Sequence, residues 1–277
     1  MTDLQNKVLE MMKWLHKFIV DNGLRYYVFG GTMLGAARHK GFIPWDDDID
    51  IIMPRDDYEK LCSLLKTPID HYVIETPYSE NKDYVYSFAK LYDINTTMTE
   101  HLRKDVTRGV AIDIFPIDGL GNTLEEAKRY YRKIDRKNAF KDARVCAYRK
   151  GRKWYKNFAI FLARLIPNCF VSEHKLCQKI DALNKKRSMN DYQFFGINMS
   201  KYRSRDIHNK DLLGKPTEFV FEDTVVYGFE HYEEYLRETF GDWKKLPPES
   251  SRHPDHDFIN LDLNKSFMTL SINNKKD

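Results

Sequence analysis

Apolar residues at the start of the chain recur every three to four positions, with charged and polar residues between them. This spacing, which runs from Leu4 to Ile19, is typical of an amphipathic helix with one buried face. The cluster Asp21-Asn22-Gly23 interrupts the pattern, and glycine suits the residue that follows the last turn of a helix. The pattern therefore predicts an N-terminal helix that ends near residue 22, and it does not have the organisation of a secretory signal.

Shorter apolar runs, several with the two-residue alternation of a strand, follow up to about residue 120. The predicted strands are Tyr26–Phe29, Asp48–Met53, Tyr72–Ile74, Tyr84–Leu91 and Val110–Phe115. We also expect a short helix over Thr32–Arg38, and a second helix that has Asp56 as its N-cap and runs through Leu65. The first part of the chain is therefore predicted to mix helices and strands.

Helical patterns dominate after Gly119. Thr123 and Glu126 have the spacing of a capping box, which predicts a long basic helix from there to about Tyr148. The later predicted elements are helices over Trp154–Ile166, Ser172–Ser188 and Tyr232–Phe240, and a β segment over Glu218–Val226. Together the patterns predict an α+β protein, with a catalytic core over residues 1–122 and a mostly helical part over residues 123–277, or one continuous domain.

The composition is that of a globular protein, with 42% hydrophobic and 31% charged residues in a chain of 277. The four cysteines lack C-x-x-C spacing, which argues against a zinc ribbon or a disulfide framework and favours a reducing compartment. No apolar run approaches the ~18 residues that a membrane span needs. These features predict a cytoplasmic protein.

The net charge of +4 hides a strong imbalance along the chain. Residues 128–187 carry nineteen Lys and Arg against four Asp and Glu, whereas the rest of the chain is acidic. Within this basic segment, the run Trp154–Ile166 is compatible with a helix that touches anionic lipid at the membrane surface. It is also compatible with an ordinary core helix whose basic face is solvated, and we favour this second interpretation. No nucleic-acid-binding motif accompanies the charge, so no nucleic-acid partner is expected.

The strongest chemical signal is a glycine-rich turn, Gly30-Gly31-Thr32, followed closely by the acidic run Trp45-Asp46-Asp47-Asp48-Ile49-Asp50. If the strand starts early enough, Asp46, Asp48 and Asp50 share one face, because alternate residues of a strand project to the same side. Carboxylates this close repel one another unless a cation lies between them, and Mg²⁺ suits oxygen ligands combined with phosphates. The glycine turn offers backbone N–H groups at a helix N-terminus, which attract phosphate. The combination favours a metal–phosphate site over a solvated acidic loop.

A further carboxylate, Asp113, lies inside the otherwise apolar strand Val110–Phe115. Burial of an unpaired carboxylate is costly, so Asp113 needs a cation or strong hydrogen-bond donors. It is a candidate metal ligand, and the structural alternative is that it caps a turn or pairs with an arginine. Asp118, which precedes Gly119, is interpreted as a turn residue.

These segments together resemble the nucleotidyltransferase superfamily, which has the DNA polymerase β-like fold. The continuous stretch from Gly30 to Asp50 resembles more specifically the LicD family of phosphocholine transferases, distant relatives of the fukutins. Further matches to this family are Ser87–Asp93, Ile112–Asp118, Tyr235–Trp243 and Leu246–Glu249. One departure is the run Arg252-His253-Pro254-Asp255-His256, where many members have adjacent histidines.

The resemblance implies transfer of phosphocholine, or of a similar phospho-alcohol, from CDP-choline or a related donor to a glycan hydroxyl, with release of CMP. It implies Mg²⁺ or Mn²⁺ as the cofactor, and a cell-surface glycan as the acceptor, which can be lipid-linked. Asp48, Asp50 and Asp113 would hold the metal, and Asp113 could also take the acceptor proton. The residues implied for donor binding are Gly30, Gly31, Thr32, Arg38, Trp45, Asp46 and Lys90. Either cation, Arg38 or Lys90, could equally be a structural partner of an aspartate.

A choline headgroup binds to aromatic faces, and Trp45 beside the acidic run is the first candidate for that contact. Trp243 is a weaker candidate, as are His253 and His256 in the C-terminal block. Two other functions stay open: a nucleotidyltransferase that uses an NTP and releases pyrophosphate, and a non-catalytic protein that binds glycan or lipid with the same fold. Ethanolamine and aminoethylphosphonate stay open as alternatives to choline.

Overall fold

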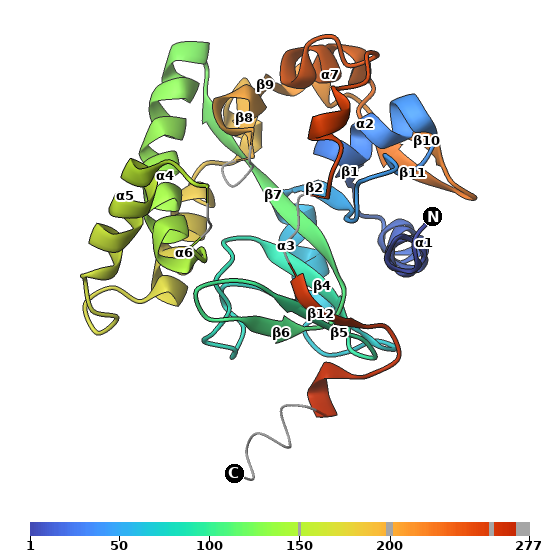
Figure 1. The fold of residues 1–277 in the computed structure, drawn as a ribbon. Coiled ribbons are helices and arrows are strands. Elements are labelled where there is room, and N and C mark those ends of the chain that lie inside the picture. The colour runs from blue at the N-terminus through green and yellow to red at the C-terminus, as the bar shows by residue number, and fades with distance from the viewer. Residues whose placement is uncertain (149–150, 198–201, 255–257, 270–277) are drawn as a thin grey trace.

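The computed structural model describes residues 1–148, 151–197, 202–254 and 258–269 of the chain (Figure 1). Its first element is helix α1, Asp3–Asp21, which begins with a capping box between Thr2 and Gln5. The apolar stripe from Leu4 to Ile19 is buried along one face of this helix. The prediction of an N-terminal helix that ends near residue 22 is confirmed.

The centre of the fold is a mixed sheet with the strand order β1–β2–β7–β4–β3. These strands are β1 (Tyr27–Val28), β2 (Asp50–Pro54), β3 (Tyr72–Glu75), β4 (Ala89–Asp93) and β7 (Ala111–Gly121). Strands β2 and β7 run parallel, and the other neighbours run antiparallel. Helix α2 (Gly30–His39) connects β1 to β2, and α3 (Arg55–Leu64) follows β2. The predicted α+β class with a mixed sheet is confirmed.

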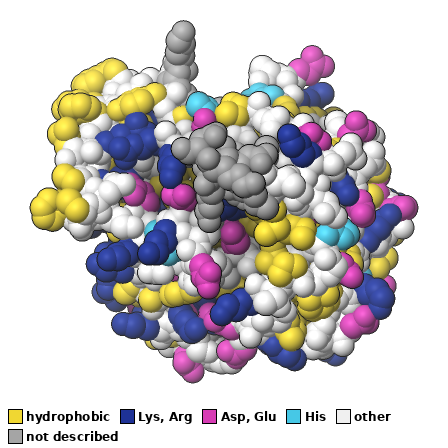
Figure 2. Space-filling model, turned by 90° about the horizontal axis from the view of Figure 1, so that it is seen from below, with side chains coloured by type: hydrophobic (Ala, Val, Ile, Leu, Met, Phe, Trp, Pro, Cys, Tyr) yellow, Lys and Arg dark blue, Asp and Glu magenta, His cyan; other side chains and the backbone are white. Residues whose placement is uncertain are grey.

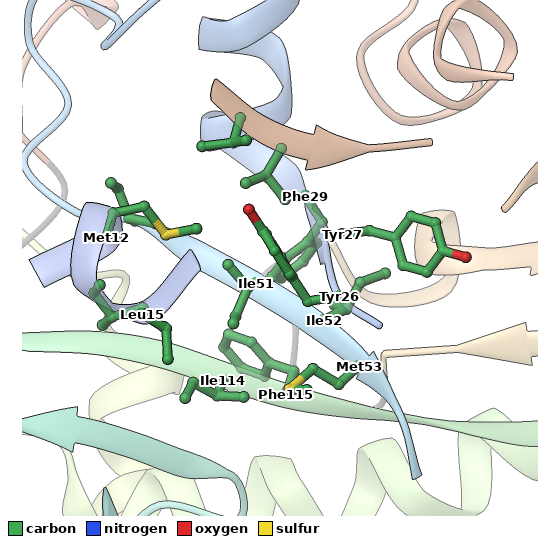
Figure 3. Close-up of a cluster of buried hydrophobic side chains, with 14 of the residues drawn as sticks. Met12, Leu15, Tyr26, Tyr27, Phe29, Ile51, Ile52, Met53, Ile114 and Phe115 are labelled. Carbon is green, nitrogen blue, oxygen red and sulfur yellow. The ribbon is translucent and has the colours of Figure 1, made fainter. Parts of the chain in front are cut away.

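Apolar side chains from α1, β1, β2 and β7 form one core beside this sheet (Figure 3). Figure 3 shows Met12 and Leu15 of α1 next to Ile51 of β2, with Ile114 on the neighbouring strand. All four side chains are fully buried, and burial of one such side chain stabilises a fold by about 1.5–3 kcal/mol. This packing holds the beginnings of β2 and β7 side by side.

Strand β2 begins at Asp50, two residues later than predicted, so Asp48 lies in a loop. Two hydrogen bonds hold this loop in place. The N–H of Asp46 donates to the carbonyl of Ile43 at 2.8 Å, and the Gln5 side chain donates to the carbonyl of Asp46 at 2.8 Å. The prediction that the strand begins at Asp48 is therefore wrong, because a contact from α1 anchors this segment in a loop. The condition under which Asp46, Asp48 and Asp50 would share one strand face is not met.

Two other predicted boundaries also move for identifiable reasons. Strand β4 begins at Ala89 rather than Tyr84, because the hydroxyl of Tyr84 donates to the carbonyl of Phe88 and closes the preceding segment on itself. Helix α3 has Pro54, not Asp56, as its N-cap. Asp56 lies in the first turn of the helix instead, where the helix dipole favours a carboxylate.

Strand β7 is longer than predicted and continues to Gly121. Its second half pairs with β8 (Phe194–Gly196), which pairs in turn with β9 (Ile207–Asn209). Asp118 therefore lies in a strand, where its buried carboxylate forms an ion pair with Arg55 at 2.6 Å. The prediction of a turn at Asp118 is wrong, because a cation distant in the sequence neutralises the carboxylate inside the strand.

Three helices follow β7 and lie together on one side of the molecule in Figure 1. They are α4 (Leu124–Val145), α5 (Trp154–Arg164) and α6 (Glu173–Asn184), as predicted. The hydroxyl of Thr123 accepts the N–H of Glu126 at the start of α4. The interpretation of α5 as an ordinary core helix is wrong, because only Ile160 and Ala163 of this helix are buried.

The remaining elements return to the first part of the chain. Hairpin β10 (Thr217–Phe221) and β11 (Thr224–Gly228) is followed by α7 (Tyr232–Phe240), which packs beside α2. Strand β12 (Phe258–Asp262) pairs with β5 (Thr97–Glu100), and β5 pairs with β6 (Val106–Arg108). Short 3₁₀ helices occupy Met189–Asp191, Arg203–Asp206, Lys210–Leu212 and Glu249–Ser251. Strand pairs β7–β8 and β5–β12 cross the boundary predicted at residue 122, and the division into 1–122 and 123–277 stays a prediction.

Candidate active site

Three consecutive carboxylates lie close together in the loop before β2. Asp46, Asp47 and Asp48 each offer one oxygen, and these three oxygens lie within 4.8 Å of one another. All three residues are partly exposed. A set of carboxylate oxygens this compact fits the preference of Mg²⁺ and Mn²⁺ for oxygen ligands. The sequence analysis selected Asp46 and Asp48 through strand alternation, but the loop brings them together and adds Asp47.

Asp50 and Asp113 lie opposite each other in the parallel pair β2–β7. On the other side of β7, the antiparallel register with β4 places Lys90 opposite Asp113. Registered residues of neighbouring strands project to the same face, so Asp50, Asp113 and Lys90 form a row across three strands. Lys90 Nζ lies 2.8 Å from Asp113 Oδ1. The cation that Asp113 requires is therefore Lys90.

Lys90 is buried between two carboxylates and an aromatic ring. Its Nζ lies 3.4 Å from Glu100 Oε1 and 4.5 Å from the centre of the Tyr86 ring. Burial alone lowers the pKa of an ammonium group, but the attraction of Asp113 and Glu100 outweighs it and raises the pKa of Lys90 well above its ordinary value. Lys90 is therefore protonated at neutral pH. The sequence analysis missed Glu100, because no predicted strand contained it. It also missed Tyr86, which lies in the predicted strand Tyr84–Leu91 but carries no pattern that marks it as a site residue.

The N-terminus of α2 faces the acidic residues. Gly30 has a φ of 57°, a left-handed conformation that favours glycine, and its N–H donates to the hydroxyl of Tyr235 at 2.8 Å. At Gly31, a Cβ atom would lie 2.5 Å from Asp46 Oδ2, so any larger residue would displace this carboxylate. The positive end of the helix dipole favours negative charge at this place. Because a carboxylate lies here, the helix end is also suited to a phosphate.

The three residues predicted to cradle phosphate thus differ in their surroundings. The N–H of Gly30 has Tyr235 as its partner. The hydroxyl oxygen of Thr32 accepts the N–H of Asp50 at 2.9 Å, which ties α2 to the start of β2. Gly31, in contrast, lines an open cleft. Of the three, Gly31 is the residue best placed to contact a bound donor.

A cleft of ≈ 720 Å³ opens beside this helix end. Its wall combines predicted residues from both parts of the chain: Gly31, Arg38, Trp45, Asp46, Trp243 and His253. They meet because α7 and the segment after it pack against α2. Tyr202, Phe240 and Arg252 also line the cleft, and the sequence analysis did not identify them. Only the resemblance of the C-terminal block to its family pointed to this side of the cleft.

Arg38 joins the two sides of the cleft. Its Nη1 donates to the carbonyl of Trp243 at 2.9 Å and to that of Lys245 at 3.3 Å. Partial burial lowers the pKa of Arg38, although a guanidinium stays charged in proteins. Arg38 therefore bonds to two backbone carbonyls of the segment after α7, and its positive charge lies in the cleft wall.

Both predicted tryptophans have a cation over their rings. The guanidinium of Arg252 lies 5.6 Å from the centre of the Trp45 ring, and Lys244 Nζ lies 5.2 Å from that of Trp243. The faces of these two rings are thus suited to a positively charged group. His253 is exposed, and its Nδ1 lies 3.1 Å from the carbonyl of Pro254. His256 lies outside the described residues.

A second, smaller cavity of ≈ 50 Å³ lies on the other side of the acidic loop. Its polar lining comes from Asp47, Asp48, Lys90, Glu100 and Asp113. Asp46 lines the large cleft, whereas Asp47 and Asp48 line the small cavity. The acidic loop therefore forms a wall between the cleft and the cavity. The candidate site is therefore a large cleft with a helix N-terminus, next to a compact group of carboxylates and one lysine.

This part of the chain matches a known protein family. A family model described as LicD/FKTN/FKRP, nucleotidyltransferase domain, matches residues 23–157, which include the α2 turn, the acidic loop, Lys90 and Asp113. Over this segment the chain is similar to the LicD family. The resemblance seen in the sequence is confirmed, including the relation to the fukutin group that the family description names.

Two named relatives have related activities. The lipopolysaccharide cholinephosphotransferase LicD of Haemophilus influenzae is 28% identical over 251 residues, which cover 90% of this chain and 92% of that protein. The ribitol 5-phosphate transferase FKRP of human and mouse is 59% identical over 29 residues, which cover 10% of this chain and 6% of that protein. Both relatives are, by name, transferases of phosphate groups that carry an alcohol.

Proposed function

We propose that this protein transfers phosphocholine, or a similar phospho-alcohol, from a CDP-activated donor to a hydroxyl of a cell-surface glycan, and that it releases CMP. The observation that carries the proposal is the convergence of one helix N-terminus and four aspartates on one cleft and its adjoining cavity, with Asp50 opposite one of them in the sheet. The similarity to the cholinephosphotransferase over 90% of the chain supports the choice of phosphocholine. Lipopolysaccharide or teichoic acid are the acceptor classes that we expect.

The donor fits the large cleft in one orientation. Its phosphates would lie at the N-terminus of α2, near Gly31 and the guanidinium of Arg38. Its quaternary ammonium would lie against the ring of Trp45 or Trp243. In the described structure, Arg252 lies over the first of these rings and Lys244 over the second. Ethanolamine would bind less tightly to the same rings, because water hydrates a primary ammonium group more strongly than a quaternary one, and this hydration is lost on binding.

The carboxylates fit a divalent cation such as Mg²⁺ or Mn²⁺. Asp48, Asp50 and Asp113 are the proposed ligands, and the compact loop adds Asp46 and Asp47 as further candidates. A metal ion bound by these residues supplies neutralisation of phosphate charge and stabilisation of the attacking and leaving oxygens. Because the acidic residues otherwise repel one another, an ion of this charge also explains why so many lie together.

The proposed reaction is an in-line displacement at the choline-bearing phosphorus. The acceptor oxygen forms the new P–O bond, the P–O bond to the CMP phosphate breaks, and the hydroxyl proton passes to Asp113. Lys90, 2.8 Å from Asp113, orients this carboxylate and balances its charge. We further propose that the chain has the nucleotidyltransferase fold, that it acts in the cytoplasm, and that its acceptor is a lipid-linked glycan.

The test is direct. The purified protein is incubated with CDP-choline, Mg²⁺ and candidate glycans, and CMP release and glycan modification are measured together. We expect CMP in amounts equal to the phosphocholine transferred, with none after removal of the metal by a chelator. CDP-ethanolamine and CTP are run in parallel, because pyrophosphate released from CTP would favour a nucleotidyltransferase instead. Absence of both products with every acceptor would contradict a transferase function.

A further inference from the structure

Helix α5 and the turn that follows it expose an unusual amount of apolar surface. Nine of the nineteen large hydrophobic side chains that are exposed among the described residues lie between Tyr148 and Phe170. Trp154 is 78% exposed and Phe170 is 80% exposed. In Figure 2, hydrophobic side chains gather at the left edge of the visible face, with Lys and Arg side chains next to them. A contiguous apolar patch of this kind marks an interaction site.

The exposed side chains form one stripe along α5. Trp154, Phe158, Phe161 and Leu165 follow one another at three- and four-residue steps, so they share a face of the helix. The rings of Phe158 and Phe161 are stacked, with centroids 6.4 Å apart. The opposite face of the helix carries its buried residues, Ile160 and Ala163, and α5 packs on α4. We call the exposed stripe, together with Phe170, the α5 surface.

A buried arginine holds this surface in place. Arg144 of α4 has no solvent exposure, and it donates to the carbonyls of Ala163 and Ile166 at 2.7 and 2.8 Å. It also donates to Asn168 Oδ1 and to the carbonyl of Val171 in the turn after α5. Because these bonds tie the end of α5 and the turn to α4, the outward orientation of the apolar stripe is part of the fold.

The charged residues of the segment that carries the α5 surface all have one sign. The sequence has no acidic residue between Asp142 and Glu173, while six Lys and Arg lie between Tyr148 and Phe170. Lys153 and Lys156 are exposed on either side of Trp154 and Tyr155. Tryptophan, tyrosine and lysine combine an apolar body with a polar end, which suits the boundary between lipid headgroups and acyl chains.

We propose that the α5 surface docks on the anionic interface of a lipid bilayer, with its apolar stripe in the membrane boundary and its cations on the headgroups. The helix would lie in the plane of the membrane, because its 11 residues extend only about 16 Å. In the part of the chain that the structure describes, no helix has the length and apolar character needed to span a bilayer. A second copy of the chain is a poorer partner, because a two-fold interface would bring like cations together.

Vesicle binding tests the proposal. The wild-type protein is mixed with phosphatidylcholine vesicles that contain or lack phosphatidylglycerol, and bound protein is measured by co-sedimentation and by the fluorescence of tryptophan. We expect binding only to the anionic vesicles, and a steep fall as salt rises. Trp154→Gln, Phe158→Gln and Phe161→Gln together should weaken binding at least about tenfold, because the apolar anchors are lost. Lys153→Gln with Lys156→Gln should weaken it by about fivefold for each charge at low salt.

Matched controls change exposed residues of the same types elsewhere. Val220→Gln with Ile259→Gln, and Lys66→Gln with Lys215→Gln, should bind vesicles as the wild type does. Circular dichroism verifies that each variant is folded. The proposal is overturned if the wild type does not bind anionic vesicles at low salt, or if the triple variant binds equally well. A dimer that dissociates in the triple variant, without vesicle binding, would assign the surface to a second copy. No result here depends on the transferase activity, which is measured separately with a short acceptor.

Discussion

The two ends of strand β7 carry aspartates in opposite electrostatic settings. Asp118 is buried, and Arg55 bridges it to Asp181, with N–O distances of 2.6 and 2.8 Å. Asp113, five residues earlier on the strand, is partly exposed and has Lys90 as a partner. Among the residues that the structure describes, Asp47, Asp48 and Glu100 line the same small cavity as Asp113 and Lys90, and Asp50 lies opposite Asp113.

We interpret the difference as that between a structural ion pair and the proposed metal site. At the Asp118 end, the protein supplies its own cation, and the group is sealed from water. At the Asp113 end, partly exposed carboxylates lie close together, and the proposed divalent cation would reduce the repulsion between them. An acidic residue in an apolar strand is therefore not by itself a sign of function. The charges that the fold places next to it must also be known.

The largest expected effect is on activity at the Asp113 end. Asp48→Asn or Asp50→Asn should reduce transfer to background, because each removes a charge from the proposed metal ligands. The unliganded variants should melt no lower than the wild type, since the substitution relieves repulsion. Asp56→Asn, an exposed position in the first turn of α3, is the control and should keep full activity. Turnover near that of the wild type at saturating Mg²⁺ in either variant would disprove the metal-site assignment.

At the Asp118 end the expected effect is on stability. Arg55→Met leaves Asp118 and Asp181 buried without their shared cation, which should lower the free energy of unfolding by about 3–5 kcal/mol. Urea unfolding followed by circular dichroism measures the change. Arg25→Met is the matched control, because Arg25 is 56% exposed in its ion pair with Asp57, and such a pair contributes under about 1 kcal/mol. Equal losses in the two variants would contradict the distinction between the buried and exposed pairs.

Divalent metal should stabilise one end of β7 and not the other. At a concentration about a hundred times its dissociation constant, Mg²⁺ should add about 2.7 kcal/mol to the free energy of unfolding, which raises the melting temperature by several degrees. The increment should shrink in Asp113→Ala and persist in Asp118→Asn. Differential scanning calorimetry measures it with and without the metal. An unchanged increment in Asp113→Ala would return this residue to a purely structural role.

The smallest expected effect concerns His208, which is buried beside the ring of Tyr235. Its Nδ1 lies 2.7 Å from Glu238, and its Nε2 lies 3.7 Å from Asp206. Burial lowers the pKa of His208, but the two carboxylates outweigh burial and raise the pKa above its ordinary value of 6.5.

The folded state therefore binds this proton more tightly than the unfolded state. Protonation of His208 should stabilise the fold fully below pH 6.5, and the contribution should be lost as the pH rises through the folded-state pKa. Unfolding free energies measured on both sides of neutral pH should show this slope, and His208→Gln should flatten it. The exposed His231→Gln is the control. A slope of the same size in His208→Gln would assign it to another group.

Much of the local structure could be predicted from the sequence, because it depends on residues a few positions apart. The stripe from Leu4 to Ile19 and its stop at Gly23 specify α1, and Tyr232–Phe240 forms a helix with the predicted bounds. Hydrophobic periodicity and helix caps depend on residues three or four positions apart, so they can be identified in the sequence alone. The acidic run near Asp48 and the glycine turn were also visible as candidate chemistry.

Only the tertiary structure decided which charges meet. Lys90 reaches Asp113 through the register of two strands, and Arg55 neutralises Asp118 across 63 positions of sequence. The hydroxyl of Tyr235 binds the N–H of Gly30 across 205 positions. The exposure of Trp154 likewise depends on which face of α5 packs on α4. Such pairings follow from sheet register and helix packing, which sum many weak contacts between distant segments, and no short window of sequence contains them.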